Sequence, residues 1–439
     1  MFPSSHPSEF FRPHTNEESL PVSLSEAVFD ASAFDRTRES LPKKYRTHLD
    51  ELRKNIFAFC DEFEIPREAL GKKELLGTYL ASPKIPPERL AEAALFFERF
   101  NHLVTHKELL KETLPKHLQE IERLYHLSEQ YNAQVSLLEQ AGILKKGTIT
   151  GIDGNRYPIP TLEHIARRLL EREYELSVKR DQGFTKLLLV PFGMSLDTLA
   201  RIFRTFLKCY KKDHPEFGRR LPTVRDGTDS QRWNPFDIGL DFETCDNFIS
   251  PKILYYPQSF DSIGDSKMEI LQRQATHLDA SFPGWTVHLF QPGDPGNPKS
   301  PGFAPIYQKG KGGDQERKLF RPPVEGGQSS RQYLRLLQEA LHDPSFPYRE
   351  ETGMTPEDWI IAFMTQLWET GEPLDLWPTT ESTSSCLIGS FFPHSAHRAG
   401  NFTGVPYALW DTGTQESHMG LTNASHEIED FGARFSVLI

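Results

Sequence analysis

The chain has 439 residues, a formal net charge of -11, 37% hydrophobic residues and 25% charged residues. That much apolar material excludes a globally disordered protein, and the length suggests about three domains. The acidic balance argues against a nucleic-acid partner, because general nucleic-acid binders carry a basic surplus. The four cysteines, Cys60, Cys209, Cys245 and Cys386, lack the paired spacing of zinc or redox centres, so we expect reduced thiols, no metal and no cofactor.

The first residues of the chain do not show a basic segment followed by an apolar one, the pattern of a secretory signal. No apolar stretch in the sequence is long enough to span a membrane. We therefore expect a cytoplasmic protein without a membrane partner. Residues 1–40 contain prolines among serines and acids, a composition typical of a flexible arm. A short helix is expected near Leu24 to Phe29.

Residues 41–142 show apolar side chains at spacings of three and four, which predicts a helical domain. Pro115 can open a long helix that ends at Gly142. The region is either an ordinary helical domain or a coiled coil that mediates homo-oligomerisation. The apolar heptad fails at Ser128 and Asn132, which favours the ordinary domain.

Residues 143–250 predict a small mixed α/β domain. Asp153-Gly154 is typical of a tight hairpin turn. Thr161 can cap a helix that runs to about Arg180, Lys186 to Val190 reads as a buried strand, and Ser195 can cap the next helix. The loop between that strand and that helix has one glycine and no lysine, so it is a structural turn and not a phosphate-binding loop.

Residues 251–439 predict a third domain. Gly284 to Phe290 alternates as a strand, and the segment 291–327, with seven prolines and eight glycines, is expected to be a mobile insertion. Helices follow Ser330 and Thr355, the second with Pro356 at its first position and Gly371 at its end. Short strands are expected at 385–388, 407–410, 418–421 and 431–439. The last should pair within the domain, because loose ends fray.

This order of strand, two helices, short strands and a closing strand resembles the C-type lectin-like fold over roughly Pro283 to Ile439. The local likeness lies in Val405-Pro406-Tyr407-Ala408-Leu409-Trp410 and Gly432-Ala433-Arg434-Phe435-Ser436-Val437. The resemblance implies neighbouring first and last strands and a loop-rich ligand surface. The expected fold class is therefore α+β, with a helical domain, a small mixed domain and a C-terminal lectin-like domain.

The whole chain also resembles an uncharacterised protein family associated with candidate-phyla bacteria. The similar segments are Gly151-Ile152-Asp153-Gly154, the run from Gln182 to Met194, and Gly353-Met354-Thr355-Pro356-Glu357-Asp358-Trp359. No activity is assigned to that family, so this resemblance implies none.

Departures from the lectin-like pattern narrow the function. Trp410-Asp411 lacks the asparagine of the calcium-binding strand, and the expected calcium loop is absent. Formylglycine-generating oxidases need two active-site cysteines, and only Cys386 lies in this region. The remaining branch is the binding scaffold, which includes the variable proteins of diversity-generating retroelements. The candidate binding residues are polar or aromatic and suited to adaptable contacts: Trp410, Asp411, Thr414, Gln415, Glu416, His418, Asn423 and His426.

Two patterns suggest chemistry. Asp241 and Glu243 would place two carboxylates on one face of a strand, the spacing of a magnesium-dependent exonuclease, although no later acidic partner is evident. His394 and His397 follow Pro393 in an expected loop without a zinc motif. We therefore expect a non-catalytic recognition protein that binds a protein or small ligand, with a metal-dependent nuclease or a self-assembling structural protein as alternatives.

Overall fold

The computed structural model describes two compact units, residues Met1–Leu110 and Lys111–Ile439. The described residues are 28, 30–66, 85, 97, 99–105, 107, 114–217, 236–238, 245–246, 252–260, 263–276, 282–312, 321–343, 345–378, 384–397 and 400–439.

The first unit contains α2 (Ala31–Ser40) and α3 (Lys43–Glu62). The side chain of Asp30 accepts a hydrogen bond from the backbone of Ala33 at 2.6 Å and caps α2. Phe34 of α2 is buried in one cluster with apolar side chains of α3. Residues 31–40 are therefore a packed helix where we expected part of an arm, because the spacing of their few apolar residues still provides one buried face.

In the second unit, the single helix expected from Pro115 to Gly142 is wrong. The chain forms η3 (Lys116–Leu118), α6 (Gln119–Tyr125) and α7 (Leu127–Gln140), and His126 separates the last two with a φ of 49°. The left-handed residue redirects the chain, so α6 and α7 do not share one axis. The apolar face of α7 is buried against β3 (Lys186–Val190) within its own unit, which accounts for that face without a coiled coil.

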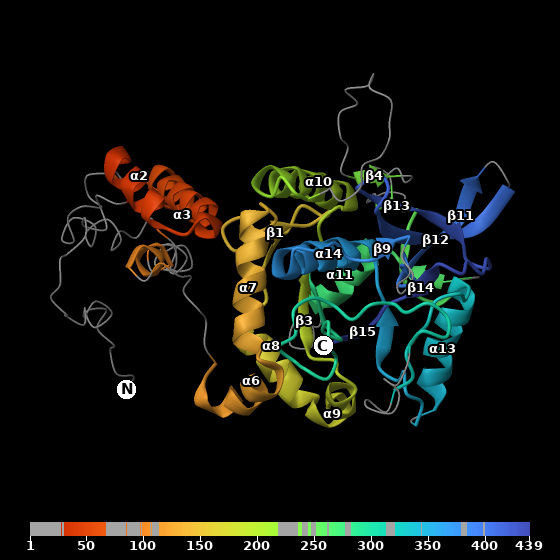
Figure 1. Cartoon of the computed structure of the whole chain (residues 1–439). Helices are drawn as coiled ribbons and strands as arrows, with labels where there is room; N and C mark the ends of the chain where they lie inside the picture. Colours follow the sequence, from red (N-terminus) through yellow and green to blue (C-terminus); the bar gives the residue numbers. More distant parts are fainter. Residues whose placement is uncertain are drawn as a thin grey trace, which may run out of the picture. The chain divides into compact units, whose positions relative to one another are not determined.

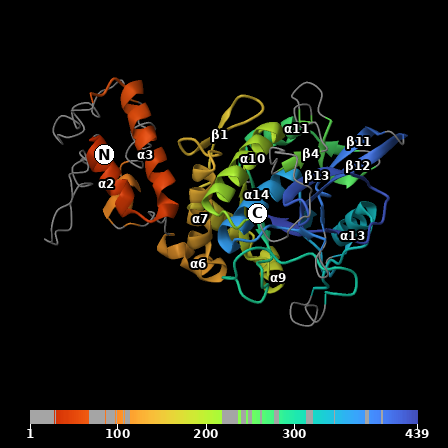
Figure 2. The same ribbon diagram turned by 45° about the horizontal axis from the view of Figure 1, so that its top comes forward.

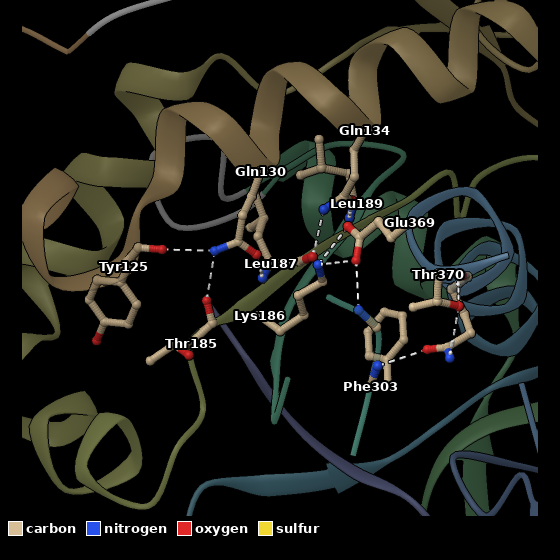
Figure 3. Close-up of polar contacts among 12 residues, drawn as sticks. Tyr125, Gln130, Gln134, Thr185, Lys186, Leu187, Leu189, Phe303, Glu369 and Thr370 are labelled. Atoms are coloured by element: carbon tan, nitrogen blue, oxygen red, sulfur yellow. Dashed lines mark hydrogen bonds and ion pairs between the residues drawn. The ribbon is translucent and has the colours of Figure 1, made fainter. Parts of the chain in front are cut away.

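Two glutamines of α7 also hydrogen bond to the backbone of β3, as Figure 3 shows. Gln134 accepts from the Leu189 N–H at 2.8 Å and donates to the Leu187 carbonyl at 2.6 Å, while Gln130 accepts from the Leu187 N–H at 2.9 Å. Gln130 and Gln134 lie four residues apart, about one helical turn, and Leu187 and Leu189 lie two residues apart on the strand. The two glutamines can therefore reach alternate residues of β3. The two side-chain amides thus form hydrogen bonds with backbone groups of β3 that would otherwise be available for pairing with a strand of another chain.

This strand lies at the edge of an antiparallel sheet with the order β3-β7-β15-β8. Its other members are β7 (Thr286–Phe290), β15 (Phe435–Leu438) and β8 (Glu351–Gly353). The closing strand is paired on both sides, as we expected, and β7 is one of its neighbours. The sheet crosses the domain boundary expected at 250/251, since β3 comes from before it and the others from after it.

Five more helices belong to this unit. They are α8 (Leu162–Glu171), α9 (Glu173–Asp181), α10 (Leu196–Asp213), α11 (Lys267–Thr276) and α14 (Pro356–Thr370). Helix α14 contacts both α10 and β3 and lies between them in Figure 1. The predicted caps at Thr161, Ser195 and Thr355 are confirmed, whereas the helix expected from Thr161 to Arg180 is broken into α8 and α9 at Arg172.

A larger mixed sheet joins β10 (Ser384–Cys386), β11 (Ser390–His397), β12 (Gly400–Asp411), β13 (Glu416–Asn423) and β14 (Phe431–Ala433). Also in it are β4 (Phe236–Ile238), β5 (Leu254–Ser259), β6 (Ile263–Asp265) and β9 (Leu376–Trp377). Figure 2 shows β11, β12 and β13 on the side of the unit where α13 (Ser330–His342) lies, away from α6 and α7.

Two local expectations concern turns. The predicted hairpin is confirmed: β1 (Thr148–Thr150) pairs with β2 (Arg156–Pro158), and Gly154 in the turn has a φ of +80°. The loop expected around Pro393 is wrong, because His394 and His397 lie in β11, which pairs with β12. An irregularity in register between Phe392 and Ser395 accommodates the proline, as bulges commonly do.

The segment 291–327 was expected to be mobile, yet its described parts are held in place. Glu369 of α14 accepts a hydrogen bond from the Gly302 N–H at 2.8 Å, and Gln366 accepts one from the Phe303 N–H at 2.8 Å (Figure 3). Phe303 is buried in the main core. The prolines and glycines permit an irregular path, and side chains of α14 supply the hydrogen bonds that a regular element would otherwise make.

Cys60, Cys245 and Cys386 are buried, Cys209 is exposed, and none of the four forms a disulfide bond. Burial raises the pKa of Cys386 to about 12. Across the helices that the structure describes, none combines the length and apolar character needed to cross a membrane.

Candidate functional site

A hollow of about 590 Å³ opens in the second unit where the last turns of α10 and α14 meet the turn between β12 and β13. That volume lies within the range of small-ligand sites. We call it the aromatic pocket. It is lined by Tyr210, His214, Glu216, Phe217, Trp368, Thr370, Gly371, Glu372, Pro373, Leu376, Trp410, Thr412 and Gln415.

The end of α10 supplies one wall. Tyr210 and His214 are four residues apart and stack with ring centroids separated by 4.1 Å, and Phe217 meets Tyr210 edge-on at 5.1 Å. Phe217 in turn contacts Trp410 at 5.1 Å. The four rings form a continuous series from the exposed His214 to the buried Trp410.

Helix α14 supplies the second wall. Its core-facing side packs Phe363 against Trp410 at 5.8 Å, and Trp368 is left half-buried at the pocket. Gly371 ends the helix with a φ of 74°, as predicted. The glycine turns the chain so that Glu372 and Pro373 also line the pocket.

The turn between β12 and β13 supplies the third wall. The Asp411 carboxylate accepts hydrogen bonds from the N–H groups of Gly413 at 2.7 Å and Thr414 at 3.2 Å. Gln415 adopts a φ of 59° and donates to the Thr412 carbonyl at 2.5 Å. The two Asp411 bonds hold the shape of the turn that brings Thr412 and Gln415 to the pocket.

Two carboxylates influence Tyr210. Burial raises the pKa of its hydroxyl, and the charges of Glu216 and Glu372 raise it further. Both carboxylates therefore act on the same ring that lines the pocket.

The structure divides the predicted binding residues between two places. Trp410 and Gln415 line the pocket, and Asp411, Thr414, Glu416 and His418 lie in or beside the same turn. The His418 ring nitrogen Nε2 lies 3.2 Å from the Thr414 hydroxyl. The turn is thus one connected polar surface with the pocket beneath it.

Asn423 and His426 lie elsewhere. Strand β13 has 8 residues, which at roughly 3.3 Å per residue separates its ends by about 23 Å. At that far end Asn423 accepts from the Ser425 N–H at 2.9 Å, and the neighbouring Ala424 carbonyl accepts from the Arg331 N–H at 3.0 Å. These residues shape a junction with α13 and do not contribute to the pocket.

Sequence reasoning missed the walls made by α10 and α14. From the apolar spacing alone, Tyr210 belongs to the buried face of the helix that Ser195 caps, and Trp359 and Trp368 to the buried face of the helix that Thr355 caps. Trp359 is a core residue at 0% exposure, but Trp368 is only half-buried. Tyr210 and Trp368 each lie within about one turn of the end of α10 or α14, where a side chain can leave the core.

A second polar cluster surrounds the first turn of α14 and is closed. The Lys267 ammonium lies 2.7 Å from Asp246, 2.8 Å from Glu357 and 2.7 Å from the Met194 carbonyl. Tyr255 donates to Glu357 at 2.7 Å. Burial alone lowers the pKa of Lys267, but the two carboxylates outweigh it, so the pKa lies above its ordinary value.

The same region brings a serine, a histidine and an aspartate together. His288 Nδ1 lies 3.0 Å from the Ser436 hydroxyl, and His288 Nε2 lies 3.2 Å from Asp358 Oδ1. The second contact lacks hydrogen-bond geometry. All three residues have 0% exposure, so no substrate could reach the serine. We refer to these residues together with Lys267, Asp246, Glu357 and Tyr255 as the closed polar centre.

Asp241 and Glu243, the candidate pair for a magnesium-dependent exonuclease, lie outside the described residues. The exonuclease hypothesis therefore stays a prediction. Within the described ranges, no group of three or more histidine, cysteine, aspartate or glutamate residues could hold a metal ion.

Comparison of the chain with protein-family models, with curated proteins and with solved structures finds no match.

Proposed function

We propose that the second unit is a non-catalytic recognition module that binds a ligand in the aromatic pocket. The observation that carries this proposal is the convergence of Tyr210, Trp368 and Gln415, from three distant parts of the chain, on one open hollow of about 590 Å³. An open hollow with aromatic walls and a few polar groups is the usual form of a small-ligand site.

The distribution of reactive side chains supports recognition over catalysis. A possible nucleophile, base and acid are present in Ser436, His288 and Asp358. All three side chains are buried at 0% exposure. A catalytic base must come within hydrogen-bond reach of its substrate. We therefore give those three residues a structural role and place ligand binding in the aromatic pocket.

We extend the proposal to the fold of the C-terminal region, which we assign to the C-type lectin-like class. The pairing of β7 with β15, and the position of α13 and α14 between them in the chain, support this assignment. The polar turn from Asp411 to His418 would then belong to the ligand surface. Asn423 and His426 do not enter the proposed site.

The proposal is tested by native mass spectrometry of the full chain with a defined mixture of amino acids, nucleosides, monosaccharides and organic amines. We expect at least one component to bind the parent protein. Tyr210→Leu and Gln415→Ala should each reduce the bound fraction, because both side chains line the pocket.

Leu341→Ala is the matched control, since Leu341 is 72% exposed on α13 and does not line the pocket. Circular dichroism confirms that each variant is folded. Binding that persists in both pocket variants, or a mixture from which nothing binds, would contradict the proposed function.

A further inference from the structure

The lining of the aromatic pocket has a marked charge bias. Two of its residues, Glu216 and Glu372, carry carboxylates, and none of the described lining residues is a lysine or an arginine. The chain as a whole carries a net charge of -11. An anionic ligand would meet repulsion here, whereas a cation would be attracted both from a distance and at contact.

The second feature is the density of aromatic rings. Tyr210, Trp368 and Trp410 line the pocket together with Phe217 and the imidazole of His214. A cation within about 6 Å of a tyrosine or tryptophan ring is attracted by the negative face of that ring. Rings and carboxylates line the same pocket. Burial raises the pKa of Tyr210, and the charges of Glu216 and Glu372 raise it further.

These two features restrict the kind of cation. A bare ammonium or a metal ion is strongly hydrated, and it would need several oxygen ligands to replace its water. An alkylated ammonium spreads its charge over methyl groups, which can contact aromatic rings without unpaired hydrogen-bond donors. Recognition of quaternary ammonium groups by aromatic cages rests on this chemistry.

We infer that the aromatic pocket binds the trimethylammonium group of an organic cation. The inference rests on the proposed recognition function and names the ligand class for the same site. Aromatic rings contact the methyl groups, and Glu216 and Glu372 balance the charge.

The test measures binding to the full-length protein by isothermal titration calorimetry with three probes. Choline carries the trimethylammonium group, 3,3-dimethyl-1-butanol has the same shape without the charge, and a short peptide with one trimethyllysine presents the group on a polypeptide. We expect choline or the peptide to bind, with the neutral isostere roughly tenfold weaker than choline. The preferred probe identifies the source as a small molecule or a protein side chain.

Two variants test whether the cation binds in the aromatic pocket. Glu216→Gln removes a charge at an exposed position and should weaken cation binding about two- to fivefold. Trp368→Leu removes a ring and should weaken it by roughly tenfold. Glu339→Gln on α13 is the matched control for charge, because its carboxylate is exposed and lies outside the pocket; it should leave binding unchanged.

Three results would overturn the inference. They are equal affinity for choline and the neutral isostere, no binding of either cationic probe, and cation binding that Glu216→Gln and Trp368→Leu both leave intact. The proposed function survives the first two if another compound binds and Tyr210→Leu abolishes that binding. If no compound binds at the pocket, both fail.

Discussion

The two ends of α14 differ in what their side chains can reach. Its first turn carries Glu357 and Asp358, which belong to the closed polar centre with Lys267 and His288. Its last turns carry Trp368 and Gly371, which line an open hollow. The residue types associated with catalysis are at the closed end and those associated with recognition at the open end. Access, and not residue type alone, therefore decides which end contacts a ligand.

The largest effect should come from Lys267→Met, which leaves the Asp246 and Glu357 carboxylates buried without their cation. We expect a loss of about 3–5 kcal/mol in the free energy of unfolding, measured with urea. Adding Glu357→Gln should recover part of this loss, because it removes one stranded charge. Lys208→Met, at an exposed position of α10, is the control and should change the stability by less than about 0.5 kcal/mol.

A loss below about 1 kcal/mol for Lys267→Met would mean that water reaches the carboxylates. The centre would then be open, and the contrast between the two ends of α14 would disappear.

Gln134→Leu should have the next largest effect. It removes the partners of the Leu189 N–H and the Leu187 carbonyl, both in a buried strand, and should cost about 1–3 kcal/mol. Gln140→Leu is the control, since the Gln140 side chain donates a hydrogen bond at 2.8 Å to the Ser136 hydroxyl of the same helix. Equal unfolding free energies for the two variants would argue against a role for Gln134 in covering the edge of β3.

Ser436→Ala separates a structural role from a catalytic one. The serine contacts His288 at 3.0 Å, so we expect a stability loss of about 0.5–1.5 kcal/mol. The parent protein should not react with a fluorophosphonate probe at Ser436. Labelling of Ser436, identified by peptide mass spectrometry and absent in the variant, would show that the closed polar centre is accessible. The two ends of α14 would then not differ in access.

The smallest stability effect should come from Gln415→Ala at the pocket. Its side chain donates to the Thr412 carbonyl at the surface of a turn, and we expect a change within about 0.5 kcal/mol. The variant should bind the ligand with lower affinity, and its unfolding midpoint should be unchanged. A large drop in stability with unchanged affinity would assign Gln415 to the fold.

Local signals predicted much of the fold. The cap at Thr355 with Pro356, the glycine at Gly371 and the apolar run of β3 each mark an element by chemistry within a few residues. The break at His126 escaped prediction, because a left-handed non-glycine residue has no strong local signature. The order of residues 291–312 escaped prediction, because it depends on hydrogen bonds from Gly302 and Phe303 to Glu369 and Gln366, which lie far along the chain.

Only the part of the aromatic pocket formed by β12 and the turn after it was predicted from the sequence. Trp410 and Gln415 were named from the composition of one segment, and they do line the pocket. Tyr210 and Trp368 join them through packing between α10, α14 and β12, which a single sequence does not display. Asn423 was grouped with them because it is near in sequence, although a strand holds it at the opposite end.

The most direct test of the comparison is a crystallographic fragment screen of the full chain. We expect fragments, above all those with a cationic alkylammonium group, to bind between Tyr210, Trp368 and Gln415. The surroundings of Ser436 and Lys267 should stay unoccupied. Fragments that bind beside Ser436 and leave the aromatic pocket empty would contradict this expectation.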